Sequence, residues 1–447
     1  MASLTGLARR AGWNIVDQAL SALGNMLLMV VVARSVDAVA FGAFAVGFLV
    51  YSISVAVGRS FVGQPLQIRH SDETPEAFRE STRDAQATTV ALGVAGGVIS
   101  AGVGAALGGG LGGTLIAVAA CLPFLMLQDT LRMAFITNKT PQYAAVIDAV
   151  KVVAQFALLY VFLSAGWNEV GLLTLSWGIA AILSAGAGMV LLKALPRFTG
   201  IGRWWRRQRD LSTFLLAEYT LGLGAAQLGS LLVPILGTQR DAGAIRGGET
   251  LLGPLNVLGT ALLGFAVPEV SRSKGAAPGH RIKAMLAMSG GMALVAVTYS
   301  TVLILLPDEI GVELFGDSWA GAQSVLLPMG LNAVASALAL GPGAMLIGMG
   351  LARKTFRLNL VKAPILLGVL VPATLEAGAV GAAWAIFLSE AVMLPFWAVT
   401  AWRAAHGRYR HLVADQDAGP ERTPEGPERD AAAATAAGED LTPRPRP

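Results

Sequence analysis

Long apolar runs, separated by short polar segments, make up most of the chain. Twelve of these runs have about the twenty residues that a helix needs to cross the ~30 Å hydrocarbon core of a bilayer. They cover residues 13–33, 40–64, 85–107, 112–134, 143–165, 169–192, 211–236, 244–268, 284–306, 319–347, 357–374 and 378–402. The runs lack the alternation of apolar and polar positions that is typical of barrel strands. The pattern therefore predicts an all-α integral membrane protein with about twelve transmembrane helices.

The composition of the 447-residue chain agrees with this assignment. Hydrophobic residues make up 54% of the chain and charged residues 14%, and the mean hydropathy is +0.60. A soluble domain has about 25% charged residues, so the composition excludes a soluble enzyme, a disordered scaffold and a nucleic-acid-binding module. The net charge of +4 indicates no nucleic-acid partner, because the cations lie in short loops between apolar runs.

The residue types that build catalytic and metal sites are scarce. The single cysteine, Cys121, excludes a disulfide framework and a thiolate metal site. The histidines lie in polar loops or near the C-terminus, so we expect no buried histidine site; they are His70, His280, His406 and His411. The sequence shows no nucleotide-binding glycine pattern and no long catalytic loop. We therefore expect no enzyme activity, no metal and no cofactor.

The loops between the runs differ in charge on the two sides of the membrane. With the N-terminus inside, the inner loops hold most of the lysines and arginines, whereas the outer side holds only Arg34, Arg240 and Arg246. Cytoplasmic loops are enriched in these cations, so both termini are predicted to be cytoplasmic in a multi-pass plasma-membrane protein. The first run follows Arg9 and Arg10 and leads into further spans, so we interpret it as an anchor.

A basic segment divides the runs into two sets of six. We predict an N-terminal six-helix lobe at 1–192, a cytoplasmic basic linker at 193–210 and a C-terminal six-helix lobe at 211–402. Asp37 and Asp241 occupy matching places in a weak internal repeat, which favours pseudo-symmetric lobes. Trp204 and Trp205 of the linker are expected at headgroup level. The Pro-, Ala- and Gly-rich tail at 403–447 is predicted to be a disordered cytoplasmic segment.

Ionisable residues inside the spans are candidates for function, because a charge at the bilayer centre costs roughly 2.5–3.5 kcal/mol on insertion scales. Glu218 and Glu390 lie well inside spans and are expected to face a cavity. Arg59 either serves a cavity or extends to the inner interface. Asp17 either couples transport to an ion or lies at headgroup depth.

Two further pairs of charges leave alternatives open. Asp148 and Lys151 are three residues apart on one helical face, so they either neutralise each other or form a coupling site. Arg34 and Arg246 lie near the outer ends of the first and eighth spans. They either converge on one central cavity or are ordinary interfacial cations.

Three short signatures resemble a known family. They are Ala33-Arg34 through Phe41-Gly42, Glu313-Leu-Phe-Gly316-Asp-Ser-Trp319, and the basic loops after the fourth and tenth spans. Together they resemble the polysaccharide-export, or O-antigen, flippase branch of the multidrug/oligosaccharidyl-lipid/polysaccharide (MOP) superfamily. The resemblance extends over nearly all of residues 1–402. It implies two six-helix lobes around a central cavity that is often cationic.

The resemblance also implies a function and a site. Members of this branch are alternating-access flippases that move a polyprenyl-pyrophosphate-linked glycan from the inner to the outer leaflet of the bacterial plasma membrane. In the related lipid II flippases, arginines on spans one, two and eight line the cavity, and Arg34, Arg59 and Arg246 occupy those spans here. The expected partners are the lipid-linked glycan, membrane lipids and a glycan polymerase or glycosyltransferases.

Other functions remain open at this point. A cation-coupled multidrug antiporter of the same superfamily would use an acidic site, for which Asp17, Glu218 and Glu390 are candidates. A major-facilitator carrier is less consistent with the sequence, because the loop after the second span lacks the Gly-x-x-x-Asp-Arg signature. The last alternative is a membrane-embedded glycosyltransferase or polymerase.

Overall fold

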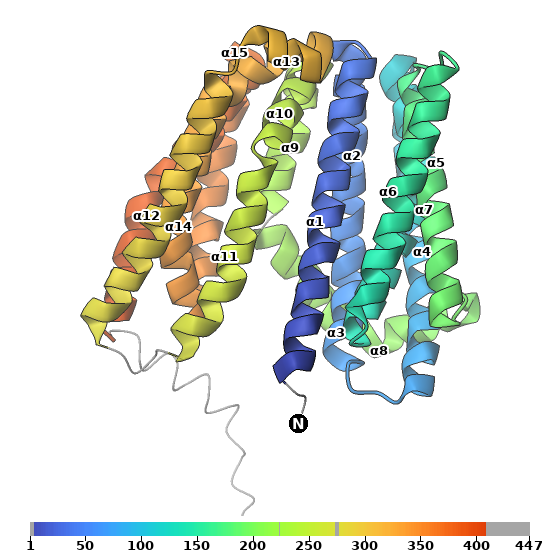
Figure 1. The fold of residues 1–447 in the computed structure, drawn as a ribbon, viewed down its shortest axis with the longest axis horizontal. Helices are drawn as coiled ribbons and strands as arrows, with labels where there is room; N and C mark the ends of the chain where they lie inside the picture. Colours follow the sequence, from blue (N-terminus) through green and yellow to red (C-terminus); the bar gives the residue numbers. More distant parts are fainter. Residues whose placement is uncertain (1–3, 223, 273–276, 408–447) are drawn as a thin grey trace, which may run out of the picture.

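A computed structural model describes residues 4–222, 224–272 and 277–407, and all regular structure in these ranges is helical (Figure 1). The N-lobe consists of α1 (Leu4–Ser35), α2 (Ala38–Gly58), α3 (Gln64–Arg69), α4 (Pro75–Leu107), α5 (Gly109–Thr137), α6 (Pro141–Ser164) and α7 (Val170–Leu192). The C-lobe consists of α9 (Gly224–Leu236), α10 (Gln239–Leu251), α11 (Gly253–Arg272), α12 (Pro278–Ile304), α13 (Asp308–Phe315), α14 (Trp319–Gly348) and α15 (Ala352–Ala405). The predicted all-α membrane fold is confirmed.

Nine helices in the described ranges are long and apolar enough to cross a membrane. The predicted runs exceed this number by three, because none of the nine helices covers the seventh or the eighth run, and the last two runs are joined in one helix. The seventh run lies on α8 (Ile201–Gly222) and α9, with residue 223 between them outside the described residues, and the eighth is divided between α10 and α11. The last two runs form α15, whose path breaks at Ala377 and Gly378, between the predicted spans. Gly378 has a φ of +55°, which glycine adopts without strain.

Aspartates hold the starts of the two helices that carry the weak internal repeat. Asp37 is the N-cap of α2, and its carboxylate accepts from the Val39 and Ala40 amides at 2.8 and 3.0 Å. Asp241 is the third residue of α10 and forms a capping box with Thr238. These contacts satisfy amide donors that a helix start leaves free.

The two lobes touch at one end, where α2 packs against α10. We call this contact the seam; it consists of Phe41 and Gly42 of α2, Gln239 and Gly243 of α10, and Phe315 at the end of α13. A Cβ atom on Gly42 would lie 1.8 Å from the Gln239 carbonyl oxygen, so only glycine permits this approach. The rings of Phe41 and Phe315 meet edge to face at 6.5 Å. The seam lies at the upper end of Figure 1, opposite the N-terminus.

The linker packs against the N-lobe at the end away from the seam. Its α8 lies across α3 and α4 (Figure 1), and the carboxylate of Asp84 accepts from Arg197 at 2.8 Å and Arg203 at 2.7 Å. Arg69 of α3 bonds to Asp210 of α8. The predicted boundaries of the lobes, linker and tail stay predictions, and residues 408–447 of the tail lie outside the described residues.

A π-helix at the end of α2 provides the linker's docking point. In η1 (Arg59–Gly63), the Phe61 carbonyl accepts from Trp204 Nε1 at 3.3 Å and from Ser212 Oγ at 3.0 Å. Trp204 is buried and stacks on His70, so the expectation that this tryptophan lies among lipid headgroups is wrong. His70 is buried too, because the linker covers the loop in which it lies. Trp205 is half-exposed and stacks on Phe61.

Candidate functional site

A large cavity lies between the lobes, lined by α1 of the N-lobe and by α10, α11, α12, α14 and α15 of the C-lobe. Its volume is about 770 Å³, which is within the usual range for ligand pockets. The lining follows α14 from Met329 to Ile347, a rise of about 27 Å at about 1.5 Å per residue. The cavity therefore runs from below the seam toward the end of the molecule at which α1 begins (Figure 1).

The broken eighth span forms part of this cavity's wall. Leu252 separates α10 from α11, and Gly253 and Pro254 open the second helix. Thr250, Leu252 and Gly253 all line the cavity. Interrupted helices are tolerated at membrane depth where the backbone is covered by protein or faces a water-filled space. The break is thus located where polar backbone groups meet the cavity.

Arg246 of α10 is the cation at the seam end of this cavity. Its guanidinium carbon lies 4.0 Å from the centroid of the Phe48 ring, which belongs to α2 of the N-lobe. The Phe48 ring in turn stacks on Trp177 at 5.5 Å with an interplanar angle of 6°. A guanidinium over an aromatic face is attracted by the negative charge of that face. This contact joins the two lobes and fixes the position of the cation.

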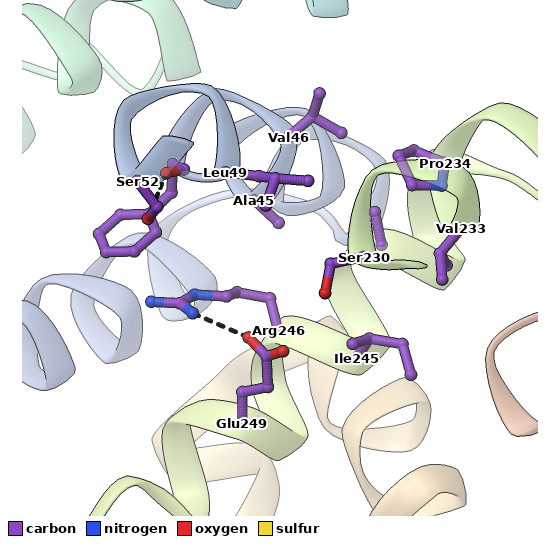
Figure 2. Close-up of a pocket in the computed structure, with 12 residues that line it drawn as sticks. Ala45, Val46, Leu49, Ser52, Ser230, Val233, Pro234, Ile245, Arg246 and Glu249 are labelled. Atoms are coloured by element: carbon purple, nitrogen blue, oxygen red, sulfur yellow. Dashed lines mark hydrogen bonds and ion pairs between the residues drawn. The ribbon is translucent and has the colours of Figure 1, made fainter. Parts of the chain in front are cut away.

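Arg246 also has a carboxylate partner. Its Nη1 donates to Glu249 Oε2 at 2.8 Å, while its buried Nε has no partner among the described residues. Both residues also line a second cavity of about 190 Å³ between α2, α9 and α10. Figure 2 shows Arg246 reaching under α2, with Ser52 on one side and Ser230 of α9 on the other. The Arg246–Glu249 pair therefore stands between two cavities and is accessible from both.

Arg59 lies in the π-helix η1 and lines neither of these cavities. Its Nε and Nη2 donate to the two oxygens of Asp129 at 2.8 and 2.6 Å, a bidentate pair. The Arg59 side chain is 41% exposed, whereas that of Asp129 is 9% exposed. The charge of this arginine is therefore already matched by a carboxylate in the N-lobe.

The Arg59–Asp129 pair belongs to a larger buried cluster in the N-lobe. Arg132 Nε donates to Asp17 Oδ2 at 2.8 Å and lies 3.5 Å from Asp148 Oδ2. Gln128 donates to the other oxygen of Asp148 at 2.6 Å. Lys151, one turn further along α6, is buried and interacts electrostatically with Asp148 and Asp129.

The charges of this cluster balance. Three cations face three carboxylates, so the formal sum is zero; the six residues are Asp17, Arg59, Asp129, Arg132, Asp148 and Lys151. Asp17 is fully buried and paired rather than exposed at headgroup depth. Asp148 has Arg132 as its closest cation partner, in addition to the expected Lys151. The use of Asp17, Asp148 and Lys151 for ion coupling stays a prediction.

The structure does not bring the remaining candidates together with Arg246. Arg34 is exposed at the end of α1 and does not line the two cavities. Glu218 falls on α8, but its side chain lies outside the described residues. Glu390 is buried in the second half of α15, where it pairs with Lys362 from the first half. Arg34, Arg59 and Arg246 were expected to share one cavity. Of these three arginines, only Arg246 lines the large cavity and the second cavity described above.

Sequence reasoning missed four residues of these sites, namely Asp129, Arg132, Glu249 and Lys362. Asp129 and Arg132 lie three residues apart in the predicted span 112–134, which is a spacing for two charges on one helical face. Lys362 lies inside the predicted span 357–374. The general rule that ionisable groups inside spans are paired or functional would have found all four. The described residues contain no group of histidine, cysteine and acidic side chains that suits a metal ion.

Comparisons with known proteins identify the fold. No family model and no curated protein sequence matches the chain. An inward-facing multidrug resistance MATE family transporter of the MOP superfamily is 13% identical, with a TM-score of 0.61 over 88% of this chain and 99% of that one. The lipid II flippase MurJ, in an inward closed conformation, is 10% identical, with a TM-score of 0.65 over 86% of each chain.

A third structure extends this set. The MATE multidrug transporter DinF-BH in complex with R6G is 14% identical, with a TM-score of 0.56 over 90% of this chain and 96% of that one. At such identities the likeness concerns the fold, which is that of MOP-superfamily transporters. The expected two-lobed helical architecture is therefore confirmed, and the O-antigen branch stays a prediction.

Proposed function

We propose that this chain is an alternating-access flippase. It moves a lipid-linked oligosaccharide, or a related polysaccharide precursor, from the inner to the outer leaflet of the bacterial plasma membrane. The observation that carries the proposal is Arg246, a cation of one lobe held on an aromatic ring of the other, inside a cavity between the lobes. With cytoplasmic termini, as the loop charges predict, the seam closes the outer side and the cavity extends toward the inner side.

The chemistry of Arg246 suits a pyrophosphate. A guanidinium is planar and always charged, and it offers several donors to phosphate oxygens. Only Nη1 is bonded to Glu249, and Nε has no partner among the described residues. A phosphate entering the cavity would compete with Glu249 for the same cation. An inside-negative potential adds about 2.3 kcal/mol per charge per 100 mV in favour of outward movement of the anion.

The walls of the cavity also suit an amphiphilic substrate. Apolar side chains such as Met26, Met292 and Leu340 share the lining with polar ones. The similarity of the fold to a lipid II flippase over 86% of the chain supports a lipid-linked substrate. A glycan polymerase and glycosyltransferases stay predicted partners.

Transport of a fluorescent lipid-linked oligosaccharide in proteoliposomes tests the proposal. We expect Arg246→Ala to lower the flipping rate about tenfold or more, because it removes the phosphate partner, and Arg246→Lys to be intermediate, because it keeps the charge without the bidentate geometry. Arg240→Ala is the matched control, since Arg240 is an exposed cation on the same helix outside both cavities. Equal rates for Arg246→Ala and Arg240→Ala would refute the proposal.

A cation-coupled multidrug antiporter is the second candidate. The observation that favours it is Glu249, a partly exposed carboxylate in the cavity. In that case a pH gradient would drive extrusion of a lipophilic cation such as a rhodamine dye, and Glu249→Gln would abolish it. Dye extrusion without glycan flipping by the same vesicles would favour this second function over the first.

A further inference from the structure

Four asparagines line the large cavity, and each comes from a different helix. They are Asn25 of α1, Asn256 of α11, Asn332 of α14 and Asn359 of α15. Within the described part of the chain, none of their amide side chains is hydrogen-bonded; the bond that Asn256 accepts from Thr260 uses its backbone oxygen. An amide at membrane depth is costly unless it meets water or a ligand. The four amides are therefore free to bind a molecule in the cavity.

The same cavity holds almost no charge. Arg246 and Glu249 are its charged lining residues among those the structure describes, and they are paired at 2.8 Å. Apart from these two residues and the four asparagines, the polar side chains of the lining are hydroxyls, while the rest is aliphatic, methionine or aromatic, including Trp397. Once Arg246 is engaged by a phosphate, the lining offers no second cation to an anionic group.

We propose that the cavity selects an uncharged, hydroxyl-rich glycan on the pyrophosphate, and that the four asparagines are its specificity-determining residues. Each amide presents two donors and one acceptor group, which match neighbouring sugar hydroxyls. A sugar carboxylate or sulfate would be buried without a cationic partner, and such a penalty against the wrong ligand is a source of specificity. The inference rests on the proposed flippase function and narrows it to neutral glycans.

The test compares two polyprenyl-pyrophosphate oligosaccharides of equal length in proteoliposomes. One contains neutral hexoses alone, and in the other a single hexuronic acid replaces a hexose. We expect the neutral compound to be flipped at least about tenfold faster. Affinity in detergent, measured by titration of the same two compounds, should show a preference in the same direction.

Variants assign the preference to the amides. The double variant Asn332→Ala with Asn359→Ala removes two hydrogen-bonding groups and should slow flipping of the neutral compound about five- to tenfold. Asn332→Lys adds a cation and should speed flipping of the acidic compound relative to the neutral one. Asn138→Ala is the matched control, because Asn138 is exposed at the end of α5 and outside the cavity.

The outcomes separate the inference from the function on which it rests. Equal flipping of both compounds, with the expected loss in Arg246→Ala, would overturn the inference and keep the flippase. Amide variants that behave like Asn138→Ala would overturn the role of the asparagines. Wild-type protein that is monodisperse but neither binds nor flips either compound would overturn the proposed function and the inference with it.

Discussion

Gly42 sets how closely the two lobes approach at the seam. A Cβ atom at this position would lie 1.8 Å from the Gln239 carbonyl oxygen and 2.4 Å from its carbon. Cβ contacts under 3.0 Å are essentially never seen, so Gly42→Ala requires the backbones of α2 and α10 to separate by at least 1.2 Å. Both partners are backbone atoms in helices, so no side-chain rotation relieves the clash. The added methyl group therefore opposes the closed seam and not the opened one.

The size of the effect follows from the energy of overpacking. Inserting a methyl group into a packed interface costs typically 1–3 kcal/mol, and a bias of that size shifts a two-state equilibrium about 5- to 150-fold. We therefore expect Gly42→Ala to populate conformations in which the seam is open. Larger residues at position 42 should act more strongly.

Pulsed EPR distances across the seam measure this shift. Spin labels at Trp167→Cys of the N-lobe and Leu305→Cys of the C-lobe are suitable, since both positions are exposed, in a Cys121→Ala background. Gly102→Ala is the matched control, because Gly102 lies in a helix with nothing within 4 Å of its Cβ position. An unchanged distance distribution in folded Gly42→Ala would refute the reasoning, even if the variant lost stability.

Two further predictions concern the N-lobe. Asp17→Asn should lower the free energy of unfolding in detergent by about 3–5 kcal/mol, because it leaves the buried Arg132 short of a partner. Adding Arg132→Gln should recover part of this loss, because it removes the unpaired cation. If the loss in the double variant equalled the sum of the losses in the two single variants, the reasoning would be contradicted. The hydrogen bond from Arg69 lowers the pKa of Asp210, so this contact stabilises linker docking above about pH 4 and is lost as the pH falls through the lowered pKa. Spin-label mobility at Arg206→Cys should accordingly rise on acidification. Asp210→Asn should weaken this pH dependence and leave the part that comes from the Asp84 contacts with Arg197 and Arg203. An unchanged acid response in Asp210→Asn would contradict the reasoning.

The helical layout was predictable because length and hydropathy are local properties of the chain. The predicted end of one span at 374 and start of the next at 378 bracket the break at Ala377 and Gly378. What local hydropathy does not contain is how a span is divided. The eighth run appears continuous in sequence, yet Gly253 and Pro254 begin a new helix there.

The site was less predictable, because charge pairs join helices that are distant in sequence. Arg59 and Asp129 are separated by 70 positions, and Asp17 and Arg132 by 115. Reading each span separately finds Arg59 as a lone cation and suggests a cavity, whereas its partner on α5 makes it part of a neutral cluster. Arg246 was assigned to the cavity from its position on span eight, but its aromatic support from Phe48 depends on how the lobes meet.

Asp241 connects the seam to the wall of the large cavity. Its Oδ2 accepts from the Thr238 amide at 2.8 Å at the start of α10, and its Oδ1 accepts from the Ala379 amide at 2.7 Å, where the second half of α15 begins. Charge-assisted bonds of this kind are stronger than neutral ones, so α10 moves at the seam only by carrying α15 along or by giving up a bond. Since α10 bears Arg246 and α15 bears Trp397, opening of the seam changes the cavity as well. Asp37, its counterpart in the N-lobe, bonds only to amides of its own helix in the described structure. Both aspartates of the repeat therefore stabilise the start of their helix, whereas only Asp241 also bonds to the last span of its lobe.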